Sequence, residues 1–98
     1  MSWATPYILA LKEQEEVEFR PRGSSMEPLV KDNQLVRVQR VTDETIIENG
    51  SIVLCVVNGR QYLHLVKAVN ADRYLIGNNR GGLNGWTNRK HIFGVLVK

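Results

Sequence analysis

The strongest constraint on the fold is a continuous apolar run that ends in a hairpin turn. Residues Ile52–Val57 carry no charged side chain, and such a run is typical of a strand that is buried on both faces. Asn58-Gly59 follows directly, and this dipeptide is the strongest short-range signal for a two-residue β-hairpin. The returning strand is predicted over residues 61–69, so the core must be built at least partly on an antiparallel sheet.

The remaining sequence predicts one helix and further strands. Thr5-Pro6 marks a helix start, with Thr as the cap and Pro at the first helical position, and we expect this helix to end near Glu16. Alternating or apolar runs predict further strands over residues 17–20, 35–41, 73–76 and 92–97. Residues 77–90, rich in Gly and Asn, are predicted as a long loop. The pattern indicates a mainly β fold with one short N-terminal helix.

Length and cysteine content indicate the kind of protein. A chain of 98 residues can form one domain with a single core, and we expect a helical segment over residues 1–16 and a β domain over residues 17–98. The one cysteine, Cys55, lies in the apolar run and should behave as a small buried hydrophobic residue. No uncharged stretch approaches the roughly 20 residues of a membrane helix, and the N-terminus has no signal-peptide pattern. We expect a cytoplasmic protein without a membrane anchor.

Charge is distributed unevenly along the chain, although the net charge is only +3. Acidic side chains outnumber basic ones in the first half, whereas Asp72 is the last acidic residue in the sequence. The basic residues that follow include Arg80, Arg89 and Lys90, with aromatic residues among them. Basic groups interleaved with aromatic rings can bind nucleic acids. At this density of charge a solvated surface is the favoured interpretation, so nucleic-acid binding is not expected.

Two residues are candidates for chemistry, Ser25 and His64. Gly23 and Pro28 bracket a turn that carries two adjacent hydroxyls, Ser24 and Ser25, and a nucleophilic hydroxyl requires such an exposed turn. His64 lies inside the predicted returning strand. A neutral imidazole, with an ordinary pKa of about 6.5, can accept a serine proton near neutral pH. Taken alone, a histidine in a strand such as His64 is more often a half-buried ring bonded to a backbone carbonyl, and that is the favoured interpretation at this point.

The segment Ser25-Met26-Glu27-Pro28, followed by an apolar pair, a polar turn and a strand, resembles the nucleophile box of the LexA-like and type I signal peptidase superfamily. The second box of that family is a Gly-Asp-Ile-Val-like strand, a hairpin and a strand with the base. Gly50-Ser51-Ile52-Val53 through His64 is similar to it. The resemblance implies coiled β-sheets with a partly barrel-like core. It places the chain with the His branch of archaeal and endoplasmic-reticulum signal peptidases.

The chain departs from the family pattern in its turns. Asn33-Gln34 stands where the family has Gly-Asp, and Gly50-Ser51 also lacks the aspartate. The downstream Gly-Asp-Asn segment reads Gly77-Asn78-Asn79, and we expect Asn78 to lie nearest the far side of the His64 ring. An amide can hold an imidazole tautomer, but it cannot stabilise the imidazolium by charge.

Lys67 is the alternative base, because the larger family uses lysine. Residues three apart on a strand face opposite sides, so only one of His64 and Lys67 can meet Ser25. Lysine would also need a pKa lowered by burial, so His64 is favoured. The N–H of Ser25 is the expected oxyanion donor, with the Ser24 hydroxyl as a second donor.

The resemblance implies a serine peptidase that cleaves a peptide bond through an acyl-enzyme, with Ser25 and His64 as catalytic residues. A peptide or protein is then the substrate, and we expect no cofactor and no metal. Two alternatives stay open. The first is an inactive peptidase-fold module for binding or dimerisation, including a homodimer, and the second is a nucleic-acid-binding β domain that uses the basic C-terminal half.

Overall fold

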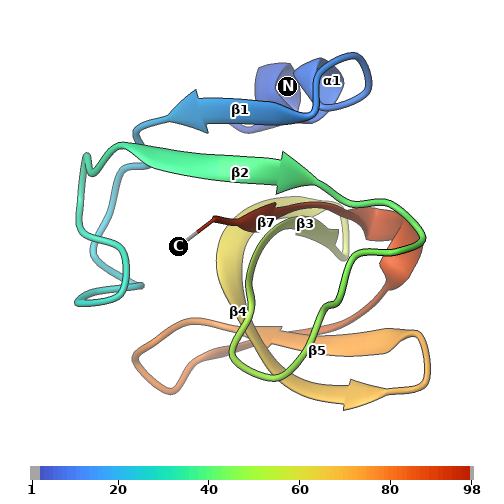
Figure 1. Cartoon of the computed structure of the whole chain (residues 1–98). Helices are drawn as coiled ribbons and strands as arrows, with labels where there is room; N and C mark the ends of the chain where they lie inside the picture. Colours follow the sequence, from blue (N-terminus) through green and yellow to red (C-terminus); the bar gives the residue numbers. More distant parts are fainter. Residues whose placement is uncertain (1–2, 98) are drawn as a thin grey trace.

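The computed structural model describes residues 3–97, which form one short helix, seven strands and a single 3₁₀ turn (Figure 1). In chain order the elements are α1 (Thr5–Ala10), β1 (Glu16–Phe19), β2 (Val36–Arg40), β3 (Ile52–Val57), β4 (Arg60–Asn70), β5 (Arg73–Gly77), β6 (Leu83–Asn88), η1 (Arg89–His91) and β7 (Ile92–Leu96). Met1 and Ser2 of the predicted helical segment and Lys98 of the basic tail lie outside the described residues. No helix within residues 3–97 has the length and apolar character needed to cross a membrane.

All seven strands belong to one antiparallel sheet in the order β1-β2-β7-β3-β4-β5-β6. The 11-residue strand β4 pairs with β3 on one side and β5 on the other, and the sheet coils along it (Figure 1). The Thr87 hydroxyl in β6 donates to the Val56 carbonyl in β3 over 2.8 Å, which ties the end of the coil to its centre. The predicted mainly β, coiled fold is confirmed, and within residues 3–97 the sheet stays open rather than closing into a barrel.

The central strand β3 is buried on both faces, as the apolar run predicts. Ile52 and Leu54 pack into a core with α1, β1 and β2, whereas Val53, Cys55 and Val57 pack into another core with β5 and β7. The expected single core is therefore divided in two by β3. Burial raises the pKa of Cys55 to about 12, so its thiol is inert and serves as the predicted hydrophobic residue.

The N-terminal helix is shorter than predicted. α1 ends well before Glu16, because Glu16 is already the first residue of β1. The Glu15 carbonyl accepts a hydrogen bond from the Arg40 N–H over 2.7 Å, so the chain is drawn into the sheet at this point. Tyr7 of α1 stacks on Phe19 of β1 with ring centroids 4.3 Å apart, which holds the helix against the first strand.

The predicted loop over residues 77–90 is wrong in its second half, where β6 and η1 form. Strand alternation is hidden in β6 because Thr87 is its only buried residue. Gly85, with φ +128°, and a register shift against β5 further obscure the pattern. Only the turn over residues 78–82 remains a loop, and its position next to the segment that carries Ser25 gives it a part in the site.

Candidate active site

Ser25 lies in a turn between β1 and β2, where an exposed segment meets the core. Met26, directly after it, and Val30, further along the segment, are each 4% exposed and pack into the core with α1 and β1. The Val30 N–H donates to the Met26 carbonyl over 3.0 Å and closes one turn of chain. Gly23 has φ +111°, a conformation that residues with a side chain rarely adopt. Ser25 is thus held half-buried between a sharp bend and two buried anchors.

His64 reaches this turn from β4, where it pairs with Val53 of β3. Its ring stacks on Tyr62, with ring centroids 4.9 Å apart. The Oγ atom of Ser25 lies 3.2 Å from Nε2 of His64. The fold therefore brings together at hydrogen-bond distance two side chains that are 39 positions apart in the sequence.

The far side of the imidazole is occupied by Asn84, not by Asn78. Nδ1 of His64 lies 2.7 Å from Oδ1 of Asn84. Since an amide oxygen only accepts, Nδ1 carries the proton and Nε2 keeps the lone pair that faces Ser25. The expectation for Asn78 is wrong because β6 is not apparent from the residue pattern. Asn84 lies in that strand at a register shift against β5, and such shifts re-aim side chains.

The surroundings of His64 favour its neutral form. Burial lowers the pKa of His64 below its ordinary value, and the hydrogen bond with Asn84 opposes this with a smaller effect. Within residues 3–97 no Asp or Glu forms an ion pair with the ring. The imidazole is therefore able to accept a proton near neutral pH, but an imidazolium formed there has only an amide beside it.

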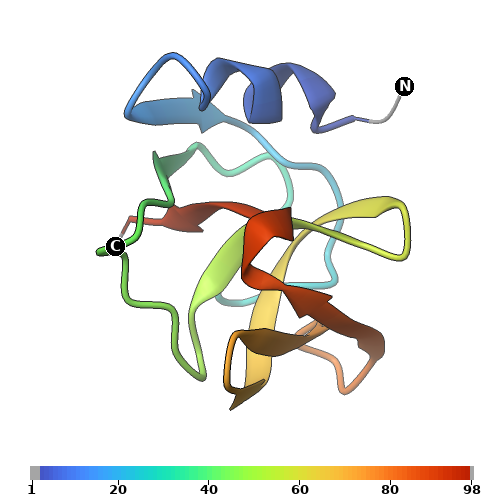
Figure 2. The ribbon, with the colours of Figure 1, turned by 90° about the vertical axis from the view of Figure 1, so that its right-hand side faces the viewer.

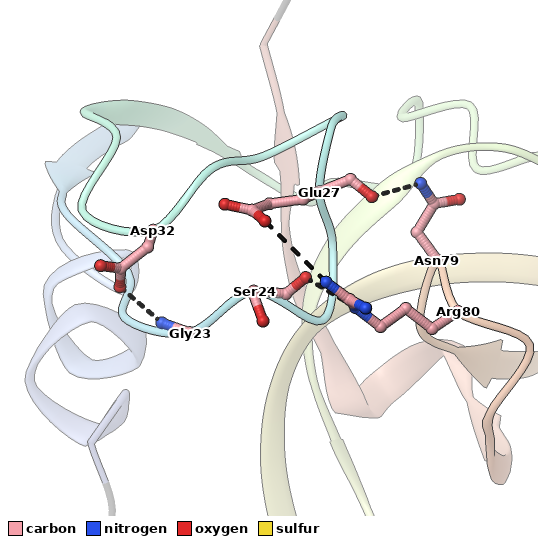
Figure 3. A network of polar contacts seen from close by, with 6 residues as sticks. All are labelled: Gly23, Ser24, Glu27, Asp32, Asn79 and Arg80. Atoms are coloured by element: carbon pink, nitrogen blue, oxygen red, sulfur yellow. Dashed lines mark hydrogen bonds and ion pairs between the residues drawn. The ribbon is translucent and has the colours of Figure 1, made fainter.

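The turn between β5 and β6 holds one side of residues 23–28, the segment around Ser25 that we call the serine turn (Figure 3). The Asn79 N–H donates to the Ser25 carbonyl over 2.9 Å, and the Asn79 side chain donates to the Glu27 carbonyl over 3.0 Å. Nε of Arg80 donates to the Ser24 carbonyl over 3.1 Å, and its guanidinium lies 3.9 Å from the Glu27 carboxylate. The sequence did not indicate this role of Asn79 and Arg80, although Asn79 is the last residue of the segment that resembles the downstream box of the family, and Arg80 follows it directly.

Further contacts shape the two turns themselves. Oδ1 of Asn78 accepts hydrogen bonds from the N–H groups of Arg80 and Gly82, over 2.8 and 2.9 Å, so Asn78 closes its own turn. On the opposite side of the serine turn, Oδ1 of Asp32 accepts the Gly23 N–H over 2.7 Å (Figure 3). Asn33 has φ +62°, the left-handed conformation expected of a residue in the glycine position of the family.

Lys67 and Ser24, the other candidates, lie outside the Ser25–His64 contact. Lys67 sits at a register shift between β4 and β5, and its aliphatic chain covers Gly77. Ser24 is exposed, and its carbonyl rather than its hydroxyl contacts the neighbouring turn. Within the described part of the chain, the N–H of Ser25 donates to no acceptor. That donor is therefore free to bind an oxyanion.

A cleft of about 120 Å³ opens beside the pair, between the serine turn and β4. Trp3 forms part of its wall, and its indole N–H donates to the Gln61 carbonyl over 3.3 Å. The Gln61 side chain accepts the Ala4 N–H over 2.7 Å and donates to Thr5 Oγ over 2.9 Å. The N-terminal segment is thus fastened along the cleft. The volume of the cleft is below the roughly 300 Å³ of small-molecule pockets, so the cleft suits part of an extended peptide chain.

Comparison with known proteins gives one family. The model of the Peptidase S24-like family matches residues 5–97, a span that includes α1, all seven strands, Ser25 and His64. No curated protein matches the chain. The family match agrees with the resemblance that the two sequence boxes indicate.

Proposed function

The chain belongs to the Peptidase S24-like family, and we propose that it is a serine peptidase with Ser25 as nucleophile and His64 as general base. The observation that carries this proposal is the 3.2 Å contact between Ser25 Oγ and His64 Nε2. Asn84 supports it, because its oxygen at Nδ1 selects the tautomer that a base requires. The substrate is a peptide or protein segment that lies across the cleft beside Ser25.

In the proposed reaction, Nε2 of His64 takes the Ser25 proton while Oγ attacks the carbonyl carbon of the scissile bond. The N–H of Ser25 donates to the oxyanion, and we assign the Ser24 hydroxyl as a second donor. The imidazolium then protonates the leaving amine, the C–N bond breaks, and an acyl-enzyme remains on Ser25. Water, deprotonated by Nε2, hydrolyses this ester and restores the hydroxyl.

One observation favours a second candidate function. Within residues 3–97 no carboxylate pairs with His64, so the imidazolium intermediate would be supported only by the dipole of the Asn84 amide. The same architecture can therefore serve as an inactive module that binds a peptide in the cleft. Nucleic-acid binding has less support, because Arg80 contacts the serine turn and Arg89 donates to the Thr42 and Thr45 carbonyls.

Cleavage of a peptide library, analysed by mass spectrometry, tests the proposal. The wild-type protein should produce new termini, and Ser25→Ala should abolish them. Ser24→Ala is the matched control, because it removes the adjacent hydroxyl. It should cut the same bonds about 10²-fold more slowly, the typical cost of losing one oxyanion donor. A folded wild-type protein that cuts no peptide would favour the inactive module. Loss of cleavage in Ser24→Ala but not in Ser25→Ala would show that Ser24, and not Ser25, is the nucleophile.

A further inference from the structure

A larger cleft, of about 430 Å³, lies away from Ser25. We call it the α1–η1 cleft, since residues of α1, η1 and the adjoining ends of β2 and β7 line it, among them Ile8, Leu11, Arg40, Lys90, Ile92 and Phe93. The serine turn and η1 lie on opposite sides of the molecule in Figure 1, and Figure 2 turns η1 toward the viewer below α1. The α1–η1 cleft shares no lining residue with the cleft beside Ser25.

The floor of the α1–η1 cleft is apolar. Ile8 and Leu11 contribute from the helical segment, and Ile92 and Phe93 contribute from β7. The first three are buried, and Phe93 is partly buried against the core that contains α1. Apolar side chains of a ligand would therefore gain burial here. Among residues 3–97, Phe93 is the one aromatic residue that lines the cleft, and it packs against the core and so offers no free platform for stacking a nucleic-acid base.

The rim of the α1–η1 cleft is positively charged. Lys12, Arg40, Arg89 and Lys90 line it, and among residues 3–97 Asp43 is the one acidic residue that does so. Arg89 is fixed by internal hydrogen bonds to backbone carbonyls. The other three basic side chains form no ion pair or side-chain hydrogen bond within residues 3–97, where the ion pairs all involve Arg22, Arg37 and Arg80. Unpaired charges of one sign around a concave surface attract ligands of the opposite sign.

We propose that the α1–η1 cleft binds an acidic peptide segment whose apolar side chains enter the floor. Lys12, Arg40 and Lys90 pair with its carboxylates, and the guanidinium of Arg40 can do so through two parallel hydrogen bonds. The combination of an apolar floor with an unpaired cationic rim selects a ligand that is both apolar and anionic. A volume of about 430 Å³ accommodates a few side chains rather than a folded surface. This binding is independent of the proposed peptidase activity, because the two clefts share no residue.

Fluorescence anisotropy with a labelled peptide of alternating Glu and Leu or Phe residues tests the proposal. The same peptide with Lys in place of Glu serves as the ligand control. The wild-type protein should bind the acidic peptide at least about tenfold more tightly than the lysine peptide, with affinity that falls as salt is added. Arg40→Glu with Lys90→Glu should weaken binding about tenfold or more, since two attractive pairs with the carboxylates of the peptide are replaced by repulsion. Arg40→Gln with Lys90→Gln, which removes the charges without reversing them, should weaken it less.

The matched protein control is Lys31→Glu with Arg60→Glu, which makes the same change in charge at exposed positions outside the cleft. It should leave the affinity nearly unchanged. If the two double variants weakened peptide binding equally, the effect would be one of overall charge and the proposal would be overturned. The absence of peptide binding by the wild-type protein would also overturn it. Tighter binding of a single-stranded oligonucleotide would assign the cleft to nucleic acid instead. A dimer in sedimentation that Lys90→Glu dissociates would assign it to a second copy of the chain.

Discussion

Two segments meet at the candidate active site, and they contribute different kinds of groups. The serine turn, residues 23–28, carries the Ser25 hydroxyl that meets His64, and a Ser25 N–H that donates to no acceptor within residues 3–97. The segment over residues 78–84 presents no group to the cleft, and its polar atoms hold the carbonyls of the serine turn and the ring of His64. The serine turn would supply the reacting groups, and residues 78–84 would hold those groups and His64 in position. Substitutions in the two should therefore differ in both size and kind.

The largest effect is expected when the base is removed. His64→Ala should lower kcat/KM for a cleaved peptide by at least about 10⁴-fold, because members of a catalytic unit fail together. Lys67→Ala is the matched control on the same strand, and it should leave the rate nearly unchanged because its chain covers Gly77. Steady-state hydrolysis of one peptide measures both variants. A larger loss in Lys67→Ala than in His64→Ala would exchange the roles of the two residues.

An intermediate effect is expected at Asn84. Asn84→Ala should lower kcat by roughly 10- to 10²-fold with little change in KM, because the ring tautomer is no longer fixed. Asn84→Asp should keep the tautomer and add a carboxylate that raises the pKa of His64, so the acidic limb of the pH–rate profile should move to higher pH.

Profiles of kcat against pH for the three proteins separate positioning from mere structural support. If Asn84→Asp and Asn84→Ala gave the same rate and the same profile, Asn84 would have no bearing on the state of the imidazole. Asn78→Asp is the control, because Asn78 closes its own turn and forms no hydrogen bond with His64 within residues 3–97. Its acidic limb should match that of the wild-type protein.

The smallest effect is expected where side chains hold the serine turn. Asn79→Ala removes the bond to the Glu27 carbonyl but keeps the main-chain bond to Ser25. Arg80→Gln removes the guanidinium from the Ser24 carbonyl and from Glu27. Each change should lower the free energy of unfolding by about 1 kcal/mol, which corresponds to a fall in Tm of about 4–8 °C for a domain of this size.

Calorimetry and peptide hydrolysis check these variants together. The loss in kcat should stay below about tenfold, because the core anchors of the serine turn remain in place. Arg73→Gln is the control, since Arg73 packs over the Trp86 ring, 5.6 Å from its centroid, and forms no ion pair with the serine turn within residues 3–97. A loss in Arg80→Gln as large as that in His64→Ala would mean that Arg80 acts on the reaction directly.

The same contrast explains how much the sequence could predict. The apolar run and Asn58-Gly59 predict the β3–β4 hairpin. Burial on both faces requires apolar residues throughout β3, and the positive φ values of the turn favour Asn and Gly, so both features can be recognised in the sequence. The hairpin is set by local residue chemistry. The pair at the site is predicted instead by the resemblance of the Ser-Met-x-Pro box and of the histidine-bearing strand to the boxes of a known family.

The positioning segment could not be predicted in the same way. β6 has a single buried side chain, so its strand period is not visible. Asn84 meets His64 only because a register shift between β5 and β6 re-aims it, and register depends on pairing between distant strands. The division of the core by β3 was also missed, since it depends on how the sheet coils.

Labelling with a fluorophosphonate probe, mapped by mass spectrometry, tests the central claim that His64 activates Ser25. The wild-type protein should take up one label on Ser25, at a rate that rises with pH and has its midpoint below 6.5, because burial lowers the pKa of His64 from that value. His64→Ala should take up none, and Lys67→Ala should match the wild-type rate. A folded wild-type protein that stays unlabelled from pH 5 to about 9, or is labelled on another residue, would contradict the account.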